Sequence, residues 1–237
     1  MHNPSWKRVK DRITERLYAP VQEKWYGRYQ SLYDQDLTFC QAAARYPERN
    51  SLHAYMHHYY VHLAPQNLRD HRAYFKQNSR GFGEDAFHAM WWLLLREYKP
   101  GLCLEIGVYR GQVISLWSLI AMGLGFPCEV HGISPFTPLG DTVSSYREDV
   151  DYLTDTLNSF QSFNLQPPTF VKALSTDAEA IVHITSRRWD LIYIDGSHDF
   201  EIALKDYLLC RDYLVTDGLL VLDDASFGTS FRPPRFS

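Results

Sequence analysis

The sequence of 237 residues predicts an α/β domain with a parallel sheet between two layers of helices, preceded by a helical segment. From residue 81 onward, short apolar runs alternate with longer stretches of helical periodicity, which is typical of βαβ units. Several of these runs are β-branched, which indicates strands buried on both faces of a parallel sheet. Residues 1–80 contain no convincing run of period two. The length suits one domain with an appended segment.

The first 80 residues are expected to form a helical appendage that covers the site, mediates dimerisation, or does both. Residues 6–33 and 52–63 have the pattern of helices rich in aromatic side chains, and nine of the sixteen Tyr residues precede residue 80. The second helix carries i,i+4 pairs of His, a spacing that can ligate a transition metal. We favour helix packing or the lining of a substrate pocket, because no third ligand is evident. These residues are His53, His57, His58 and His62.

From residue 81 to the end, the predicted elements follow one another in a regular order. A helix over residues 85–98 ends at Pro100-Gly101. Helices are then predicted near residues 112–124, 149–162, 177–184 and 200–214. They separate strands that are predicted at residues 102–106, 129–133, 170–174, 191–194 and 219–222.

Composition and charge exclude several classes of protein. The longest apolar run, near residues 116–126, is too short to cross a bilayer, and residues 1–10 lack the apolar core of a secretory signal. The four Cys residues form no CxxC pair, which is more typical of reduced thiols in the cytoplasm than of a disulfide framework. The net charge is −4. We therefore expect a cytoplasmic protein that binds neither a membrane nor a nucleic acid.

A glycine turn follows the first predicted strand. Gly107 lets the backbone approach a ligand closely, and Gly111 lets the next helix begin close to the strand. Free N–H groups at that helix start favour a carboxylate, and Glu105 suits a ligand ammonium or a neighbouring sulfonium. These needs fit S-adenosylmethionine better than a dinucleotide, because Tyr109 replaces a glycine of the pattern G-x-G-x-x-G. A plain strand-to-helix turn that binds no ligand is the alternative interpretation. If the loop binds the cofactor, we expect Gly107→Val to abolish cofactor binding and to leave the fold intact.

A second group of polar residues follows the fourth and fifth predicted strands. Asp195 ends the fourth strand, and Asp223 and Asp224 end the fifth. Since parallel strands end at one edge of a sheet, these carboxylates converge there and favour a cation such as Mg²⁺. His198 lies three residues beyond Asp195 and is suited to take a proton from a metal-bound hydroxyl. A loop capped by carboxylates, with an ordinary loop histidine, is the alternative.

Together, these segments resemble class I S-adenosylmethionine-dependent methyltransferases. They are most similar to the metal-dependent bacterial branch that includes sugar O-methyltransferases and cephalosporin hydroxylase-like proteins. In that branch the first metal-binding Asp lies 28 residues before an Asp-Asp or Asp-Asn pair, and the base follows the first Asp by three. The chain keeps both spacings, and the resemblance covers about residues 81–226. The segments that carry it are Leu104-Glu105-Ile106-Gly107-Val108-Tyr109-Arg110-Gly111, Tyr193-Ile194-Asp195-Gly196-Ser197-His198 and Leu222-Asp223-Asp224.

The resemblance implies a Rossmann-like three-layer sandwich with strand order 3-2-1-4-5, formed by residues 81–237. It implies transfer of a methyl group from S-adenosylmethionine to a hydroxyl of a small molecule, namely a sugar or another polyhydroxylated natural product. Asp195, Asp223 and Asp224 would bind Mg²⁺ or a similar divalent cation, and His198 would be the catalytic base. The cofactor-binding residues would include Glu105, Gly107, Tyr109 and Gly111.

The sequence departs from the class I pattern in three places. Ser134 replaces the acidic residue that usually contacts the ribose, and Ser175 is the best polar candidate for the adenine contact. Only 13 residues follow Asp224, too few for the helix and antiparallel strand pair that normally complete the sheet. We therefore expect a C-terminal truncation, whose unpaired strand edge would allow a homo-oligomer. Two rival functions are a non-catalytic module that binds S-adenosylmethionine and, disfavoured by the glycine spacing, a nucleotide-cofactor oxidoreductase.

Overall fold

The computed structural model describes residues 35–139 and 146–225, so the predicted helix over residues 6–33 and the chain after residue 225 lie outside the described residues. The described chain contains a parallel five-stranded sheet with the order β3-β2-β1-β4-β5. This confirms the predicted strand order. The strands are β1 (Leu102–Ile106), β2 (Glu129–Ile133), β3 (Thr169–Val171), β4 (Trp189–Ile194) and β5 (Leu214–Leu222).

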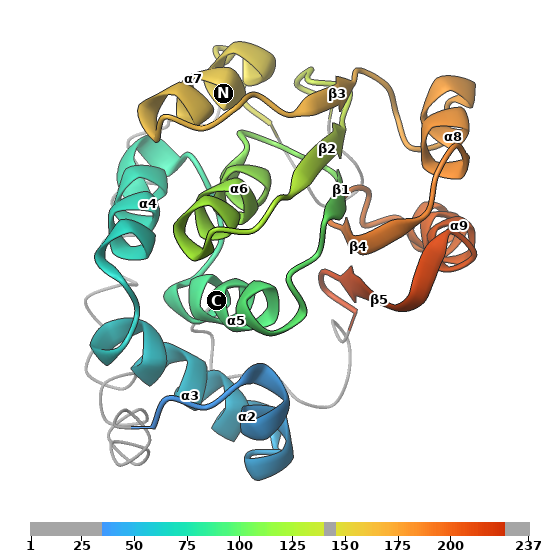
Figure 1. The fold of residues 1–237 in the computed structure, drawn as a ribbon. Helices are drawn as coiled ribbons and strands as arrows, with labels where there is room; N and C mark the ends of the chain where they lie inside the picture. Colours follow the sequence, from blue (N-terminus) through green and yellow to red (C-terminus); the bar gives the residue numbers. More distant parts are fainter. Residues whose placement is uncertain (1–34, 140–145, 226–237) are drawn as a thin grey trace. The chain divides into compact units, whose positions relative to one another are not determined.

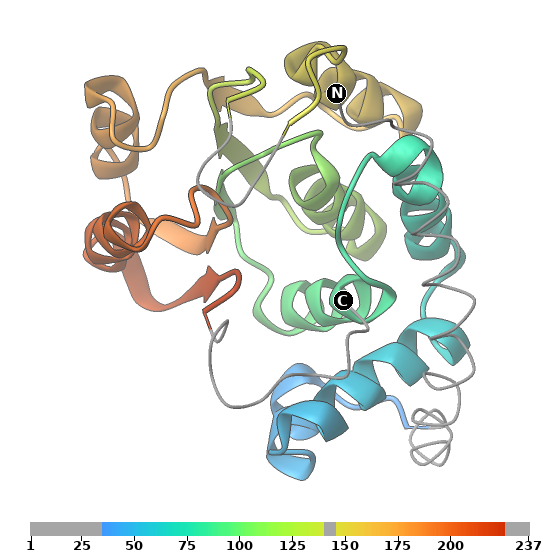
Figure 2. The same ribbon diagram turned by 180° about the vertical axis from the view of Figure 1, so that it is seen from behind.

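Helices cover both faces of this sheet. In Figure 1, α6 and α7 lie on one side of the strands and α8 and α9 on the other, and the reverse view in Figure 2 agrees. None of the described helices has the length and apolar character needed to cross a bilayer. The helices are α2 (Phe39–Arg45), α3 (Arg49–His62), α4 (Gln66–Lys76), the 3₁₀ helix η2 (Gln77–Ser79), α5 (Asp85–Tyr98), α6 (Gln112–Leu124), α7 (Tyr152–Ser162), α8 (Ala178–Thr185) and α9 (Phe200–Arg211).

The described residues divide into two compact units. The first contains residues 35–64 and 84–90, and the second contains residues 65–83 and 91–225. Helix α4 therefore belongs to the unit that contains the sheet, although it lies within the predicted appendage. In the first unit, His53 Nε2 lies 3.0 Å from Glu84 Oε2, and the rings of His58 and His62 stack. Burial lowers the pKa of His57 to about 4.

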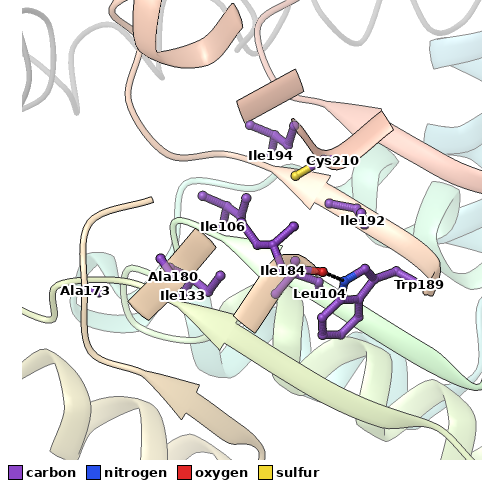
Figure 3. Close-up of a cluster of buried hydrophobic side chains, with 10 residues drawn as sticks. All are labelled: Leu104, Ile106, Ile133, Ala173, Ala180, Ile184, Trp189, Ile192, Ile194 and Cys210. Carbon is purple, nitrogen blue, oxygen red and sulfur yellow. Dashed lines mark hydrogen bonds between the residues drawn. The ribbon is translucent and has the colours of Figure 1, made fainter. Parts of the chain in front are cut away.

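The apolar strands meet in a core that fixes the sheet against α8 and α9. Figure 3 shows Ile106, Ile192 and Ile194 of the central strands among the side chains of this core, together with Cys210 of α9. Trp189 is fully buried there, and its indole Nε1 donates to the carbonyl oxygen of Ile184 over 2.9 Å. Full burial of one such large apolar side chain contributes roughly 1.5–3 kcal/mol to stability. This core packs α8 and α9 against the central strands of the sheet.

Two strands differ from their predicted bounds for reasons of local geometry. β5 begins at Leu214, five residues earlier than predicted. The strand includes the stretch before residue 219, which contains polar residues. Asp217 there has a φ of 64°, and the register between β4 and β5 shifts at Trp189 and Leu191. β3 ends at Val171 because the chain then turns, with the Leu174 N–H donating to Asp177 Oδ2.

Candidate active site

The glycine loop after β1 is held by the backbone of its neighbouring strands. The N–H of Gly107 donates to the carbonyl oxygen of Ile133 at the end of β2 over 2.9 Å. Gly107 has a φ of 97°, and a Cβ at this position would lie 1.9 Å from the carbonyl oxygen of Asp195. The missing side chain therefore makes room for the end of β4 as well as for a ligand. Contrary to the prediction from the sequence, Gly107→Val would also displace the backbone.

Gly111 and Glu105 fix the start of α6. Gly111 is the N-cap of α6 with a φ of 83°, and a Cβ there would lie 2.6 Å from Thr156 Cγ2 of α7. Glu105 is 2% exposed, and its carboxylate accepts a hydrogen bond from the backbone N–H of Ile114 in the first turn of α6. Burial, followed by the charge of Asp195, raises the pKa of Glu105 well above its ordinary value. Both residues thus help to position the glycine loop and the start of α6.

A cavity of about 360 Å³ lies at the C-terminal ends of β1, β2, β3 and β4. Four of the six predicted cofactor-binding residues line it, namely Gly107, Tyr109, Ser134 and Ser175, whereas Glu105 and Gly111 do not. Its other lining residues include Gly196 and Ser197, directly after Asp195. The predicted residues from three separate strand ends therefore share one cavity, as their positions in the sequence require of a parallel sheet.

Aromatic residues that the sequence analysis did not single out form one wall of this cavity. Tyr146 and Tyr152 line it beside Tyr109, with ring centroids 5.6 and 5.3 Å from that of Tyr109. The hydroxyl of Tyr152 accepts from the backbone N–H of Arg147 and donates to its carbonyl oxygen. Burial, followed by the effect of Tyr152, raises the pKa of Tyr109, so its hydroxyl stays neutral at physiological pH. This wall offers flat apolar faces to a ligand.

The structure brings two of the three predicted metal ligands into contact. The N–H of Asp195 donates to the carbonyl oxygen of Ile106, and that of Asp223 to the carbonyl oxygen of Ile194, so β1, β4 and β5 end side by side. The side chains of Asp195 and Asp223 are hydrogen-bonded to each other. Burial, followed by the charge of Asp223, raises the pKa of Asp195 well above its ordinary value.

The third predicted ligand, Asp224, lies beside the predicted base. Its Oδ2 is 3.5 Å from His198 Nε2, and its backbone has a φ of 49°. Burial and the charge of Asp223 raise the pKa of Asp224, and His198 partly offsets this effect. In the described part of the chain, no group of three or more His, Cys, Asp or Glu side chains is placed to hold a metal ion. The predicted three-carboxylate centre and the His pairs of α3 thus gain no support as metal sites.

Comparison with known proteins identifies the family. The sequence of residues 104–225, more than half of the chain, matches the family model described as a methyltransferase domain. The chain belongs to this methyltransferase family. The matched residues begin within β1 and end directly after Asp224. They include the glycine loop, the cavity-lining strand ends and the three Asp residues, so the domain confirms the methyltransferase assignment made from the motifs.

Solved structures agree on the fold of the methyltransferase domain. A Podospora anserina methyltransferase, PaMTH1, solved with S-adenosylhomocysteine bound, aligns with a TM-score of 0.50 and 16% identity over 68% of this chain and 63% of its own. A candidate caffeoyl-CoA O-methyltransferase from Staphylococcus aureus aligns with a TM-score of 0.53 and 14% identity over 74% of each chain. The chain thus spans less than two thirds of the length of the first protein. A comparison with curated proteins found no match.

Proposed function

We propose that the domain binds S-adenosylmethionine in the cavity at the strand ends and transfers its methyl group to a hydroxyl oxygen of a small molecule. The observation that carries this proposal is the single cavity shared by Gly107, Ser134 and Ser175 next to Asp195. A glycine loop, hydroxyl groups and tyrosine faces suit a zwitterionic ligand that also carries a nucleoside. The S-adenosylhomocysteine bound to the Podospora anserina protein of the same fold supports this choice of ligand.

Asp195 and Asp223 are the proposed ligands of a divalent cation such as Mg²⁺. Their contact at the ends of β4 and β5 provides hard oxygen donors, and Mg²⁺ is commonly held by one or two carboxylates together with water and substrate oxygens. Two carboxylates in contact repel each other unless a cation lies between them, and this repulsion favours cation binding. When bound, the cation would lower the pKa of an acceptor hydroxyl.

His198 is the proposed base, and Asp224 its orienting partner. The Oδ2 of Asp224 lies 3.5 Å from His198 Nε2, close enough to orient the imidazole. In the proposed step the hydroxyl oxygen attacks the methyl carbon, the carbon–sulfur bond breaks and the hydroxyl proton passes to His198. The sulfonium becomes a neutral thioether, so the charges balance. Positioning and charge stabilisation supply most of the acceleration. By the resemblance of the motifs, the acceptor is a sugar or another polyhydroxylated natural product.

Calorimetric titration with S-adenosylhomocysteine and with NAD tests the proposed ligand. We expect S-adenosylhomocysteine to bind with a stoichiometry near one and NAD to give no heat of binding, because Tyr109 occupies the position where a dinucleotide pattern requires glycine. The protein should be titrated with and without Mg²⁺. Binding of NAD in place of S-adenosylhomocysteine would contradict the proposal. Binding of S-adenosylhomocysteine without turnover of any hydroxylated acceptor would favour a non-catalytic module.

Removal of divalent cations is expected to stop methyl transfer and leave S-adenosylhomocysteine binding largely unchanged. Turnover of a hydroxylated acceptor would be measured in excess chelator and after addition of Mg²⁺. Asp223→Asn is expected to raise the Mg²⁺ concentration needed for half-maximal rate by about tenfold or more, because it removes one of two charged ligands. Asp212→Asn, at an exposed position after α9, is the matched control. Full activity in excess chelator would overturn the metal assignment.

A further inference from the structure

Two cysteine thiols lie side by side at the N-terminal ends of β1 and β2, opposite the strand ends that form the cavity. Cys103 is the second residue of β1, and Cys128 directly precedes β2. Their sulfur atoms are 3.4 Å apart, and the thiols are hydrogen-bonded to each other. Cys103 is fully buried, whereas Cys128 is half-buried. Neither residue lines the cavity, and the proposed reaction uses neither.

Strand pairing holds the two thiols in this arrangement. In the parallel register Cys103 pairs with Val130, which lies two residues after Cys128. Side chains two residues apart in an extended chain point to the same face of a sheet, so the thiols of Cys103 and Cys128 share one face. The N–H of Glu129 donates to the carbonyl oxygen of Gly101 over 2.8 Å, which joins the starts of both strands. The contact of the two sulfur atoms is therefore a consequence of the sheet itself.

We propose that Cys103 and Cys128 are a redox-sensitive pair that forms a reversible disulfide when a peroxide reaches the half-buried thiol. A disulfide bond is about 2.05 Å long, so the two sulfur atoms need to approach each other by only about 1.4 Å. The thiols stay reduced until an oxidant is present, as is usual for a redox-sensing pair. This modification site is separate from the cavity, and the inference does not rest on the proposed methyl transfer.

The different exposure of the two thiols sets the order of the reaction. Hydrogen peroxide first oxidises Cys128 to a sulfenic acid and releases one water, because only this thiol has access to solvent. The sulfur of Cys103 then attacks that of Cys128. The sulfur–sulfur bond forms, the sulfur–oxygen bond breaks, and the hydroxyl leaves as a second water with the proton of Cys103. Burial raises the pKa of Cys103 well above its ordinary value, so this thiol is suited to the second step and not to the first.

The disulfide would stabilise the part of the fold that contains the glycine loop. The two cysteines are 25 residues apart, and the glycine loop and α6 lie between them. A cross-link across such a segment restricts the unfolded chain, so we expect oxidation to raise the melting temperature by about 5–10 °C. Dithiothreitol should reverse this rise, because it reduces the bond to two thiols.

Peptide mapping of the whole chain tests the pair. The folded protein would be treated with a small excess of hydrogen peroxide, denatured, alkylated with N-ethylmaleimide and digested with trypsin. Trypsin cleaves after Arg110, between Cys103 and Cys128, so the two peptides stay together only when a disulfide joins them. We expect one cross-linked pair of peptides, which dithiothreitol separates. Thermal unfolding of the same samples measures the melting temperature.

Three variants separate this pair from the other cysteines. Cys128→Ser and Cys103→Ser should each abolish the cross-linked peptides and the rise in melting temperature. Cys40→Ser is the matched control and should keep both, because Cys40 is exposed and belongs to the other compact unit. If Cys103→Ser fails to fold, Cys128→Ser decides, because its position is only half-buried.

Several outcomes would overturn the inference. One is recovery of Cys103 as its N-ethylmaleimide adduct after peroxide treatment, with Cys128 unmodified or oxidised to a sulfinic acid. Another is a disulfide that joins either thiol to Cys40 instead. An unchanged melting temperature in fully cross-linked protein would contradict the stabilising effect. None of these results depends on whether the cavity binds S-adenosylmethionine, so the inference and the proposed function stand or fall separately.

Discussion

Gly107→Ala is expected to reduce the affinity for S-adenosylhomocysteine by roughly a hundredfold or more, since displacements of about 1 Å in a binding site have effects of that size. The new Cβ would lie 1.9 Å from the carbonyl oxygen of Asp195 and 2.7 Å from the Cα of Gly196. Both are backbone atoms, so the clash cannot be relieved by a side-chain rotation. The glycine loop or the backbone that follows β4 must move, and Gly107 and Gly196 both line the cavity.

Gly125→Ala is the matched control for this substitution. Gly125 also has a positive φ, of 70°, but a Cβ there would meet no atom within 4 Å. It should cost only about 1 kcal/mol of stability, the usual penalty for a non-glycine residue in this conformation, and leave binding unchanged. Calorimetry measures the affinity, and thermal unfolding separates the steric effect at Gly107 from the conformational penalty that both positions share. Wild-type affinity in Gly107→Ala would remove the glycine loop from the binding site.

The sheet was predictable from the sequence because its central strands are continuous apolar runs. The predicted bounds of β1, β2, α5 and α6 coincide with the observed ones. The start of β5 was not predictable in the same way, because Asp217-Gly218 is typical of a turn and here lies in a strand with a shifted register. Tertiary pairing with β4 overrides the local preference of this stretch.

The site was predictable to the extent that it depends on strand ends. Gly107, Ser134 and Ser175 follow three different strands, and a parallel sheet brings their positions together at one cavity. The contact of Glu105 with the backbone of α6 depends on the path of the chain, which the sequence pattern does not reveal.

Asp224 shows most clearly what a spacing rule cannot decide. The interval of 28 residues from Asp195 places both Asp223 and Asp224 at the same edge, but it does not tell where each side chain points. In the structure Asp223 contacts Asp195, whereas Asp224 lies beside His198. The backbone of Asp224 has a φ of 49°, so the two consecutive side chains leave the chain in different directions. The predicted trio of ligands thus becomes, in the proposed mechanism, a pair of ligands and an orienting carboxylate.

His198→Ala is expected to lower kcat by about a hundred- to ten-thousandfold, the usual contribution of a general base, while the affinity for S-adenosylhomocysteine stays within about twofold. His198 is exposed and is not part of the cavity wall, so its loss should affect proton transfer rather than binding of the donor. Asp224→Asn should lower kcat less, by about tenfold, because the imidazole remains but loses a charged partner. Turnover with a hydroxylated acceptor and calorimetry on the same preparations measure both quantities.

His183→Ala is the control for loss of an imidazole, since His183 contacts His131 and Trp189 and lines no part of the cavity. It should change stability more than kcat. The pair of variants at Asp223 and Asp224 then separates the two roles assigned to these neighbouring carboxylates. If Asp224→Asn raised the Mg²⁺ requirement as strongly as Asp223→Asn, Asp224 would be a metal ligand, as the spacing alone predicts. Wild-type turnover in His198→Ala would remove this histidine from the mechanism and leave proton transfer to solvent or to another group.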